Sequence, residues 1–336
     1  MSVLVTGGAG YIGSHMVLDL LEAGEEVVVL DNLSTGVLDN VAPDARVFVG
    51  DVGDEALVRR LLRAHRVDAI LHFAGSIVVP DSVFDPLGYY LNNTVKTRSM
   101  LAAAVAEAVP HVIFSSTAAV YGVPERLPIA EDSALRPLSP YGTSKLMTEL
   151  MLADVASAHG MSYAALRYFN VAGADPAGRT GQSGGKVTHL IRVACQAALR
   201  PDREVSVYGT DYPTMDGTCV RDYVHVSDLA RAHRAALRYL RQGGASRSFN
   251  CGYGTGHSVM QVLQAVGRQT GSRLKTRSAE RRPGDPAILV ADVARIQREL
   301  EWVPQFGDLG SMVEHALRWE EKLLSSRRKQ PGLVVA

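Results

Sequence analysis

The stretch that decides the fold is Val3-Leu4-Val5-Thr6-Gly7-Gly8-Ala9-Gly10-Tyr11-Ile12-Gly13, close to the start of the chain. A β-branched run comes first, glycines then recur at every third position, and an apolar helical pattern begins at Ile12. Glycine lets the backbone turn tightly and approach a pyrophosphate, whose charge faces the N–H groups at the helix start. The stretch therefore predicts a strand, a turn and a helix that together hold a dinucleotide.

An acidic residue ends the next predicted strand. Asp31 closes the run Glu26–Asp31, where a carboxylate accepts hydrogen bonds from the adenosine ribose and repels a 2′-phosphate. The cofactor expected is therefore NAD and not NADP. After the third predicted strand come Asp51 and Val52, which the sequence alone leaves either beside the adenine or in a solvated turn.

Short apolar runs alternate with helical patterns over the first half of the chain. We expect strands at Val3–Thr6, Glu26–Asp31, Arg46–Gly50, Ala69–Phe73, Val112–Ser115 and Ser162–Arg167, and helices at Ile12–Ala23, Glu55–His65, Pro86–Ala108 and Pro140–His159. Strands that alternate with helices indicate an α/β fold with a doubly wound, Rossmann-like parallel sheet. We therefore assign residues 1–170 to an NAD-binding domain.

The rhythm changes after about residue 170. We expect a smaller C-terminal α/β lobe for substrate over 171–325, some of whose segments return to the first domain, and a flexible tail over 326–336. Its predicted elements are a strand at Val205–Tyr208 and helices at Lys186–Leu199, Val226–Gln242, Val259–Thr270, Asp292–Leu300 and Leu309–Leu324.

Composition excludes several classes of protein. Lys and Arg together number 35, as do Asp and Glu, so no overall field attracts nucleic acid or a membrane. The three cysteines lie far apart, and the ten histidines show no ligand spacing, so we expect no disulfide framework and no metal. With neither a signal peptide nor a membrane-spanning run, we expect a soluble cytoplasmic protein.

Three side chains carry the expected chemistry. Tyr141 and Lys145 lie four residues apart at the start of a predicted helix, so both side chains point into one pocket. Nearby positive charge favours the phenolate, which then acts as a base near neutral pH. The third side chain, that of Thr117, follows the strand Val112–Ser115, where its hydroxyl can share a proton with a substrate oxygen or bond to the local backbone.

With these residues, the chain resembles the extended short-chain dehydrogenase/reductase family, and within it the UDP-sugar 4-epimerases. The matching runs are Val-Thr-Gly-Gly-Ala-Gly-Tyr-Ile-Gly-Ser-His (5–15), Leu-Asp-Asn-Leu-Ser (30–34), His-Phe-Ala-Gly (72–75), Tyr-Tyr-Leu-Asn-Asn (89–93), Phe-Ser-Ser-Thr-Ala-Ala-Val-Tyr-Gly (114–122), Ser-Pro-Tyr-Gly-Thr-Ser-Lys (139–145), Leu-Arg-Tyr-Phe-Asn-Val-Ala-Gly-Ala (166–174) and Asp-Gly-Thr-Cys-Val-Arg-Asp-Tyr-Val-His-Val (216–226). These runs follow the family's order, and the likeness as a whole covers about residues 2 to 322.

The resemblance implies a tightly held NAD and interconversion of UDP-glucose and UDP-galactose. Tyr141 would remove the proton of the sugar 4-hydroxyl while the C4 hydride leaves, and the 4-keto sugar would turn before the hydride returns. Lys145 would bind the nicotinamide ribose and lower the pKa of Tyr141, and Thr117 would bridge the 4-oxygen. A homodimer is also implied, formed by the helices near 88–108 and 141–158.

The remaining site residues follow from the same resemblance. Those expected at the cofactor are Gly7, Gly10, Tyr11, Ile12, Gly13, Asp31, Asn32, Asp51, Val52, Phe73, Ala74, Gly75, Asn92, Ser115, Tyr141, Lys145 and Tyr168. Those expected at the UDP-sugar are Thr117, Tyr141, Asn170, His189, Leu190, Tyr208, Arg221, Arg282 and Asp285. For the two arginines the residue chemistry agrees, because a diphosphate needs planar, bidentate donors.

Several positions depart from the family pattern. No lysine follows Gly75, His189 stands where relatives have Asn, and Leu289 lies where residue size limits the sugar. UDP-GlcNAc, UDP-glucuronate and UDP-xylose therefore stay open as alternative substrates. Ala118 and Ala119 occupy the positions of the carboxylates that dehydratases and decarboxylases carry, which argues against elimination. A non-catalytic NAD-sensing module is the alternative from another class.

Overall fold

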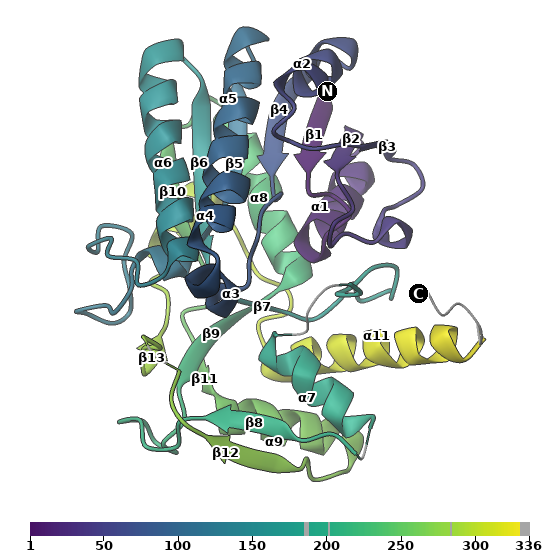
Figure 1. Ribbon diagram of the computed structural model, residues 1–336, viewed down its shortest axis with the longest axis vertical. Helices are drawn as coiled ribbons and strands as arrows, with labels where there is room; N and C mark the ends of the chain where they lie inside the picture. Colours follow the sequence, from purple (N-terminus) through teal and green to yellow (C-terminus); the bar gives the residue numbers. More distant parts are fainter. Residues whose placement is uncertain (185–187, 201, 283, 330–336) are drawn as a thin grey trace.

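The computed structural model describes residues 1–184, 188–200, 202–282 and 284–329. Its main element is a seven-stranded parallel sheet in the order β10-β6-β5-β4-β1-β2-β3 (Figure 1). These strands are β1 (Ser2–Thr6), β2 (Glu26–Asp31), β3 (Arg46–Val49), β4 (Val67–His72), β5 (His111–Thr117), β6 (Ser162–Tyr168) and β10 (Arg247–Cys251). Six of them follow the doubly wound order 3-2-1-4-5-6, which places a ligand crevice beyond their carboxyl ends.

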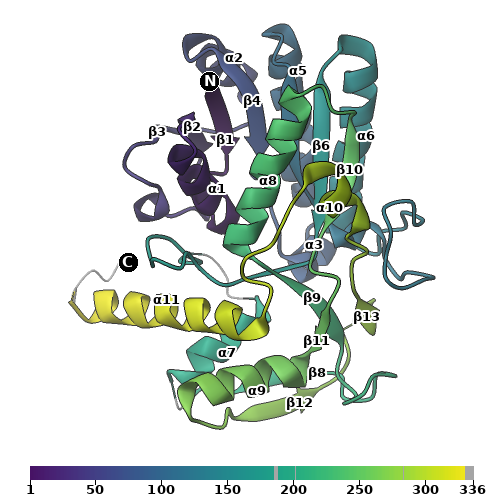
Figure 2. The same ribbon diagram turned by 180° about the vertical axis from the view of Figure 1, so that it is seen from behind.

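Helices cover both faces of this sheet, because its central strands are apolar on both sides. One face packs on α2 (Glu55–Ala64), α5 (Lys96–Ala106) and α6 (Pro140–His159). The other packs on α1 (Tyr11–Glu22), α8 (Val226–Arg241) and α10 (Ala294–Leu300), which lie in front in Figure 2. Two of the covering helices, α8 and α10, come from the C-terminal half of the chain.

A smaller lobe lies beyond the carboxyl ends of the sheet (Figure 1). Its strands are β7 (Asn170–Ala172), β9 (Val220–His225), β11 (Gly256–Ser258) and β13 (Ile288–Leu289), with β8 (Val205–Tyr208) and β12 (Thr276–Ala279) as a separate pair. Helices α7 (Leu190–Ala198), α9 (Val259–Thr270) and α11 (Leu309–Lys329) enclose its apolar core. The start predicted for α7 at Lys186 lies outside the described residues.

The helix predicted over Pro86–Ala108 is confirmed from Pro86 to Ala106, although its hydrogen bonding is not α-helical throughout. The structure has α3 (Val79–Phe84), α4 (Pro86–Tyr89), a π-helical segment (Tyr90–Val95) and then α5. The Asp85 side chain accepts from the N–H of Gly88 and so starts a new helix before Pro86. A π-helical segment widens the turn, which is common near functional sites.

Other differences concern short elements and the chain end. Six strands were not expected from the sequence, namely β7, β9, β10, β11, β12 and β13. Helix α11 continues to Lys329, which is beyond the predicted end at Leu324 and inside the expected tail of 326–336. Residues 330–336 of that tail lie outside the described part. Within the described residues, no helix combines the length and apolarity needed to cross a bilayer.

Buried neutral histidines make the fold sensitive to acid. Burial lowers the pKa of His72 to about 3, an effect to which the nearby Lys145 adds, and burial lowers the pKa of His15 and His233 to about 4. The ring of His72 is held between the hydroxyls of Thr6 and Thr97, at 2.6 and 2.8 Å. An unfolded histidine has a pKa near 6.5, so the stability from keeping these rings neutral is present above about pH 6.5 and is lost as the pH falls toward 4.

We therefore expect the free energy of unfolding to fall between pH 7 and pH 5, by up to about 2 kcal/mol for each such histidine. Urea unfolding of His72→Gln at the two pH values should show a smaller fall than the unmodified protein. The exposed His159 provides the control, since His159→Gln should leave the fall unchanged. An equal fall in all three proteins would contradict the prediction.

Candidate active site

The glycine turn lies against the end of β4. Gly7 has φ +70°, and a Cβ built on it would come within 2.6 Å of the backbone nitrogen of Ala74. A Cβ on Gly13 would lie 2.1 Å from the carbonyl oxygen of Gly7. Gly10 is the N-cap of α1 and supplies no side-chain hydrogen bond, which leaves the N–H groups of the first turn for an outside acceptor. This turn has the form needed to hold a pyrophosphate.

The two predicted acids lie at the ends of neighbouring strands. Asp31 ends β2 and accepts hydrogen bonds from the N–H groups of Ala9, at 2.9 Å, and Leu33, at 2.8 Å. Asp51, beyond β3, accepts from Lys96 of α5 at 2.6 Å. Burial opposes ionisation of Asp51, but hydrogen bonds from Lys96 and the N–H of Gly53 hold its pKa below the usual value.

A lysine therefore lies in this region, although none follows Gly75. Lys96 comes from α5, and its partner Asp51 is far from it in sequence, so the pair had no local signal. The side chain of Asn32 donates to the same carboxylate at 3.4 Å, and Val52 next to it is buried. The polar groups at the ends of β2 and β3 thus form one cluster.

The three expected catalytic side chains come together where β5 ends and α6 begins. Thr117 is the last residue of β5, and Tyr141 and Lys145 lie in the first turns of α6. The Thr117 hydroxyl accepts from the N–H of Ala119 at 3.1 Å and lies beside the Tyr141 phenol, whose pKa it lowers. The Lys145 ammonium donates to the carbonyl oxygen of Ser115 at 2.8 Å.

Burial decides the protonation of this group. It raises the pKa of Tyr141 to about 12, which the hydrogen bond from Thr117 partly offsets, and it lowers the pKa of Lys145 to about 8. Both shifts disfavour the charged form, as desolvation does. The side chains alone therefore keep Tyr141 protonated, and a cation beside the phenol is needed to make it a base.

The Ser115 hydroxyl and the Tyr168 hydroxyl are hydrogen bonded to each other across β5 and β6. Burial raises the pKa of Tyr168, so this phenol stays protonated. Phe73, which follows β4, lies 4.9 Å from His233 between ring centroids, and the ring of Tyr168 lies 5.9 Å from the same histidine. The expected residues Phe73, Ser115 and Tyr168 are thus close to one another.

The two asparagines of the π-helical segment differ in their surroundings. The predicted residue, Asn92, is half-buried and donates to the Ser76 hydroxyl at 2.9 Å. Its neighbour Asn93 is buried, accepts from the N–H of Ser76 at 2.7 Å, and donates to the Ser144 hydroxyl at 3.0 Å. A Cβ on Gly75 would lie 3.0 Å from the Asn93 oxygen and 3.8 Å from the Lys145 nitrogen. Asn93, which sequence reasoning missed, therefore ties the segment after Gly75 to α6.

In the smaller lobe, four of the expected substrate residues are joined. Arg221 of β9 is buried and ion-paired with Asp285. The Arg282 guanidinium lies 4.0 Å from the ring centroid of Tyr208, and the N–H of Asp285 donates to the carbonyl of Arg282. Pro283, between them, lies outside the described residues. One ring face of Tyr208 is thus covered by an arginine.

Of the other residues expected at the substrate, Asn170 lies close to the pair of Arg221 and Asp285, and His189 and Leu190 lie on a different element. Asn170 of β7 pairs with Tyr223 of β9, close to Arg221. His189 and Leu190 begin α7, and His189 contacts Gln182, at 3.1 Å, and the ring of Tyr11. His189 therefore adjoins the glycine turn, whereas Leu190 packs against the apolar core of the smaller lobe.

The position expected to limit sugar size lies in β13. Leu289 packs on a small core formed by Ala118, Val120, Tyr121 and Ile129, directly beyond the end of β5. β13 pairs with β9, where Leu289 lies opposite Arg221. The structure therefore places Leu289 between the Arg221 pair and the Thr117 group.

Comparisons with known proteins agree with this geometry. The model of the NAD dependent epimerase/dehydratase family matches residues 3–252. A UDP-glucose 4-epimerase of Azospirillum brasilense is 53% identical over 324 residues, which cover 96% of this chain and 93% of that protein. The structure of a UDP-glucose 4-epimerase from Brucella ovis in complex with NAD has a TM-score of 0.92 at 44% identity and covers 94% of this chain and 97% of that one.

A third relative is the UDP-glucose 4-epimerase of Bifidobacterium longum, solved in complex with NAD+ and UDP, with a TM-score of 0.91 at 37% identity. The match covers 96% of this chain and 98% of that one. The sequence relatives and the solved structures agree over nearly the full length of the chain, and the family model agrees over residues 3–252. The chain therefore belongs to the NAD dependent epimerase/dehydratase family.

Proposed function

We propose that the chain interconverts UDP-glucose and UDP-galactose by oxidising the sugar at C4 and reducing it again with inverted configuration. The chain is an NAD-dependent isomerase, as its full-length relatives are. The observation that carries the proposal is the buried group of Thr117, Tyr141 and Lys145 beside the glycine turn. Its members are those that proton removal from a sugar hydroxyl requires.

The residues present fit NAD. No side chain caps the start of α1, so its first N–H groups can bind a pyrophosphate. Glycine at position 7 keeps the turn close to the backbone of Ala74, and the Asp31 carboxylate lies where a ribose is expected. When bound, NAD accepts the hydride from C4 and later returns it. We propose that the remaining residues expected at the cofactor line the same crevice, with Asn93 added to them.

The proton steps belong to the protein's own side chains. Tyr141 takes the proton of the 4-hydroxyl and later returns it, and the Thr117 hydroxyl, which lies beside the phenol, holds the sugar oxygen in line. The Lys145 ammonium stabilises the phenolate, while its bond to the Ser115 carbonyl fixes its place. The ion pair of Arg221 with Asp285 pre-orients a guanidinium for the diphosphate.

Two other reactions of the family fit less well. Elimination of water or of carbon dioxide needs an extra carboxylate near the sugar, and the residues after Thr117 are Ala118 and Ala119, which begin a short 3-10 helix. A module that only senses NAD has no need of a buried hydroxyl, phenol and ammonium in contact. The geometry therefore favours epimerisation.

We expect purified protein to convert UDP-galactose to UDP-glucose without added NAD and without net NADH. Tyr141→Phe should lower kcat by about 10²- to 10⁴-fold, because the phenol oxygen that moves the proton is lost, while bound NAD is retained. Chromatography of the sugar nucleotides and absorbance of the nicotinamide measure the two effects. A requirement for stoichiometric NAD would instead identify a dehydrogenase.

The same assay with UDP-GlcNAc, UDP-glucuronate and UDP-xylose addresses the choice of sugar. We propose that Leu289 limits the space at the sugar, since it packs beside Ala118. Turnover of one of these sugars in preference to UDP-galactose would assign the chain to the corresponding 4-epimerase.

We propose further that the chain forms a homodimer. Large apolar side chains are exposed on adjoining elements from α3 to α6, and monomers rarely expose contiguous apolar surface of this kind. This apolar face consists of Phe84, Leu87, Leu91, Val95, Met147 and Leu150. A second copy covers it best, because helical faces of equal composition then meet about a two-fold axis.

Leu150, with 58% of its surface exposed, provides the test. Leu150→Asp should weaken dimerisation at least ~100-fold, because two carboxylates are then buried in one symmetric contact. Sedimentation velocity over a range of concentrations measures the change. Val303, exposed just after α10 on the other side of the sheet, supplies the control Val303→Asp, and a monomeric unmodified protein would refute the proposal.

A further inference from the structure

A buried ion pair lies behind the Thr117 group. Arg167 of β6 and Glu149 of α6 are only 4% and 6% exposed. The guanidinium donates to both carboxylate oxygens, with Nε 3.0 Å from Oε1 and Nη2 2.6 Å from Oε2. A buried pair of this kind is weak evidence for stability, because desolvation offsets most of the attraction. Its presence is better explained by a requirement for position.

The pair touches each element that carries a proposed catalytic side chain. Glu149 lies one turn after Lys145 and two turns after Tyr141, hence on the same face of α6. Its carboxylate accepts a hydrogen bond from Ser116, the residue before Thr117 on β5. The pair therefore fixes α6 along its axis relative to the end of β5.

Arg167 joins the pair to the loop between β5 and α6. It precedes Tyr168 on β6, and its Nη1 donates to the hydroxyl of Tyr121 at 2.9 Å and to the carbonyl of Glu131 at 3.1 Å. Tyr121 belongs to the loop between β5 and α6, so the guanidinium ties this loop to the sheet. The pair is thus hydrogen bonded to Ser116, directly before Thr117, and to Tyr121 and Glu131 in the loop that leads to Tyr141.

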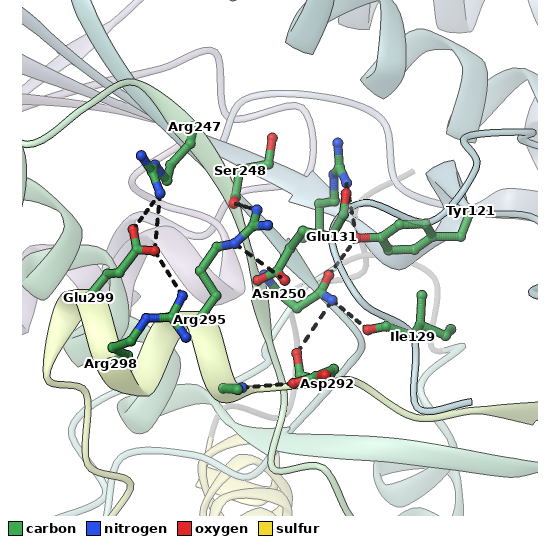
Figure 3. A network of polar contacts seen from close by, with 12 residues as sticks. Tyr121, Ile129, Glu131, Arg247, Ser248, Asn250, Asp292, Arg295, Arg298 and Glu299 are labelled. Carbon is green, nitrogen blue, oxygen red and sulfur yellow. Dashed lines mark hydrogen bonds and ion pairs between the residues drawn. The ribbon is translucent and has the colours of Figure 1, made fainter. Parts of the chain in front are cut away.

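The contacts continue into the C-terminal half of the chain (Figure 3). The Tyr121 hydroxyl donates to Asn250 of β10 at 2.7 Å. The Asn250 amide donates to the carbonyls of Ile129, at 2.7 Å, and Asp292, at 3.4 Å, and its backbone N–H donates to Glu131 at 2.9 Å. Asn250 is fully buried, and Asp292 follows β13 closely. The same network therefore holds the strand that carries Leu289.

We propose that Glu149 and Arg167 are positioning residues that set the contact between the hydroxyls of Thr117 and Tyr141. This proposal rests on the proposed function only because it takes Tyr141 to be the group that removes the proton from the sugar. Without the pair, α6 can slide against β5, and the phenol loses the hydroxyl that favours its ionised form. The groups that face Tyr141 are Thr117 from β5, Tyr89 from α4 and Tyr168 from β6, and Lys145 follows one turn later on α6.

The decisive variant is Arg167→Met combined with Glu149→Leu, because an apolar pair of similar volume leaves no unpaired buried charge. We expect this protein to fold, with kcat reduced about 10-fold or more and the acid limb of the kcat profile raised by about one pH unit. Thr117→Val should raise the same limb. The pH at which Tyr141 ionises in the NAD-bound protein is followed as tyrosinate absorbance, by difference from the matched Tyr141→Phe protein.

The control is a second strongly buried pair, Arg192 with Glu320, which joins α7 to α11 at 2.6 Å. Arg192→Met with Glu320→Leu should leave the ionisation of Tyr141 unchanged. If the Glu149 and Arg167 double variant is too unstable, Ser116→Ala removes one contact of Glu149 and should give a smaller shift in the same direction. An unchanged ionisation in these variants overturns the proposal, and absence of turnover in the unmodified protein overturns only the proposed function.

Discussion

The constraint on which the structure depends is the contact between the backbones of neighbouring strand ends. The N–H of Gly7 donates to the carbonyl of Leu30, and the N–H of Phe73 donates to that of Thr6, so β1, β2 and β4 end together. A side chain at Gly7 would collide with Ala74. Because parallel strands end at one edge, the dinucleotide turn and the phenol then lie on the same side of the sheet.

Desolvation dominates the electrostatics at this edge. It raises the pKa of Tyr141 to about 12 and lowers that of Lys145 to about 8, so near neutral pH the folded protein holds a neutral phenol one helical turn from an ammonium. Tyr141 would become a base once the positive charge of an oxidised nicotinamide lay beside the phenol. Arg167, in contrast, has its pKa raised in spite of burial, because it donates to the Glu149 carboxylate and to the Tyr121 hydroxyl.

Much of the site could be predicted because its signals are local. Tyr141 and Lys145 share a helix face, and Thr117 ends an apolar run. The signals that failed are non-local: the partner of Asp51 is Lys96 on another element, and Asn93 is distinguished from Asn92 only by the π-helical turn. β10 was missed because a short strand with alternating polar residues is identified only by its pairing with β6.

That late strand has a consequence for how the chain is made. β6 leaves the ribosome long before β10, so the edge of the growing sheet stays open while about 80 further residues are synthesised. Until β10 pairs with β6, the backbone groups of β6 beside Arg167 are unpaired, and an unpaired strand edge can bind another nascent chain. The catalytic half is therefore the part of the protein whose folding waits for the other half.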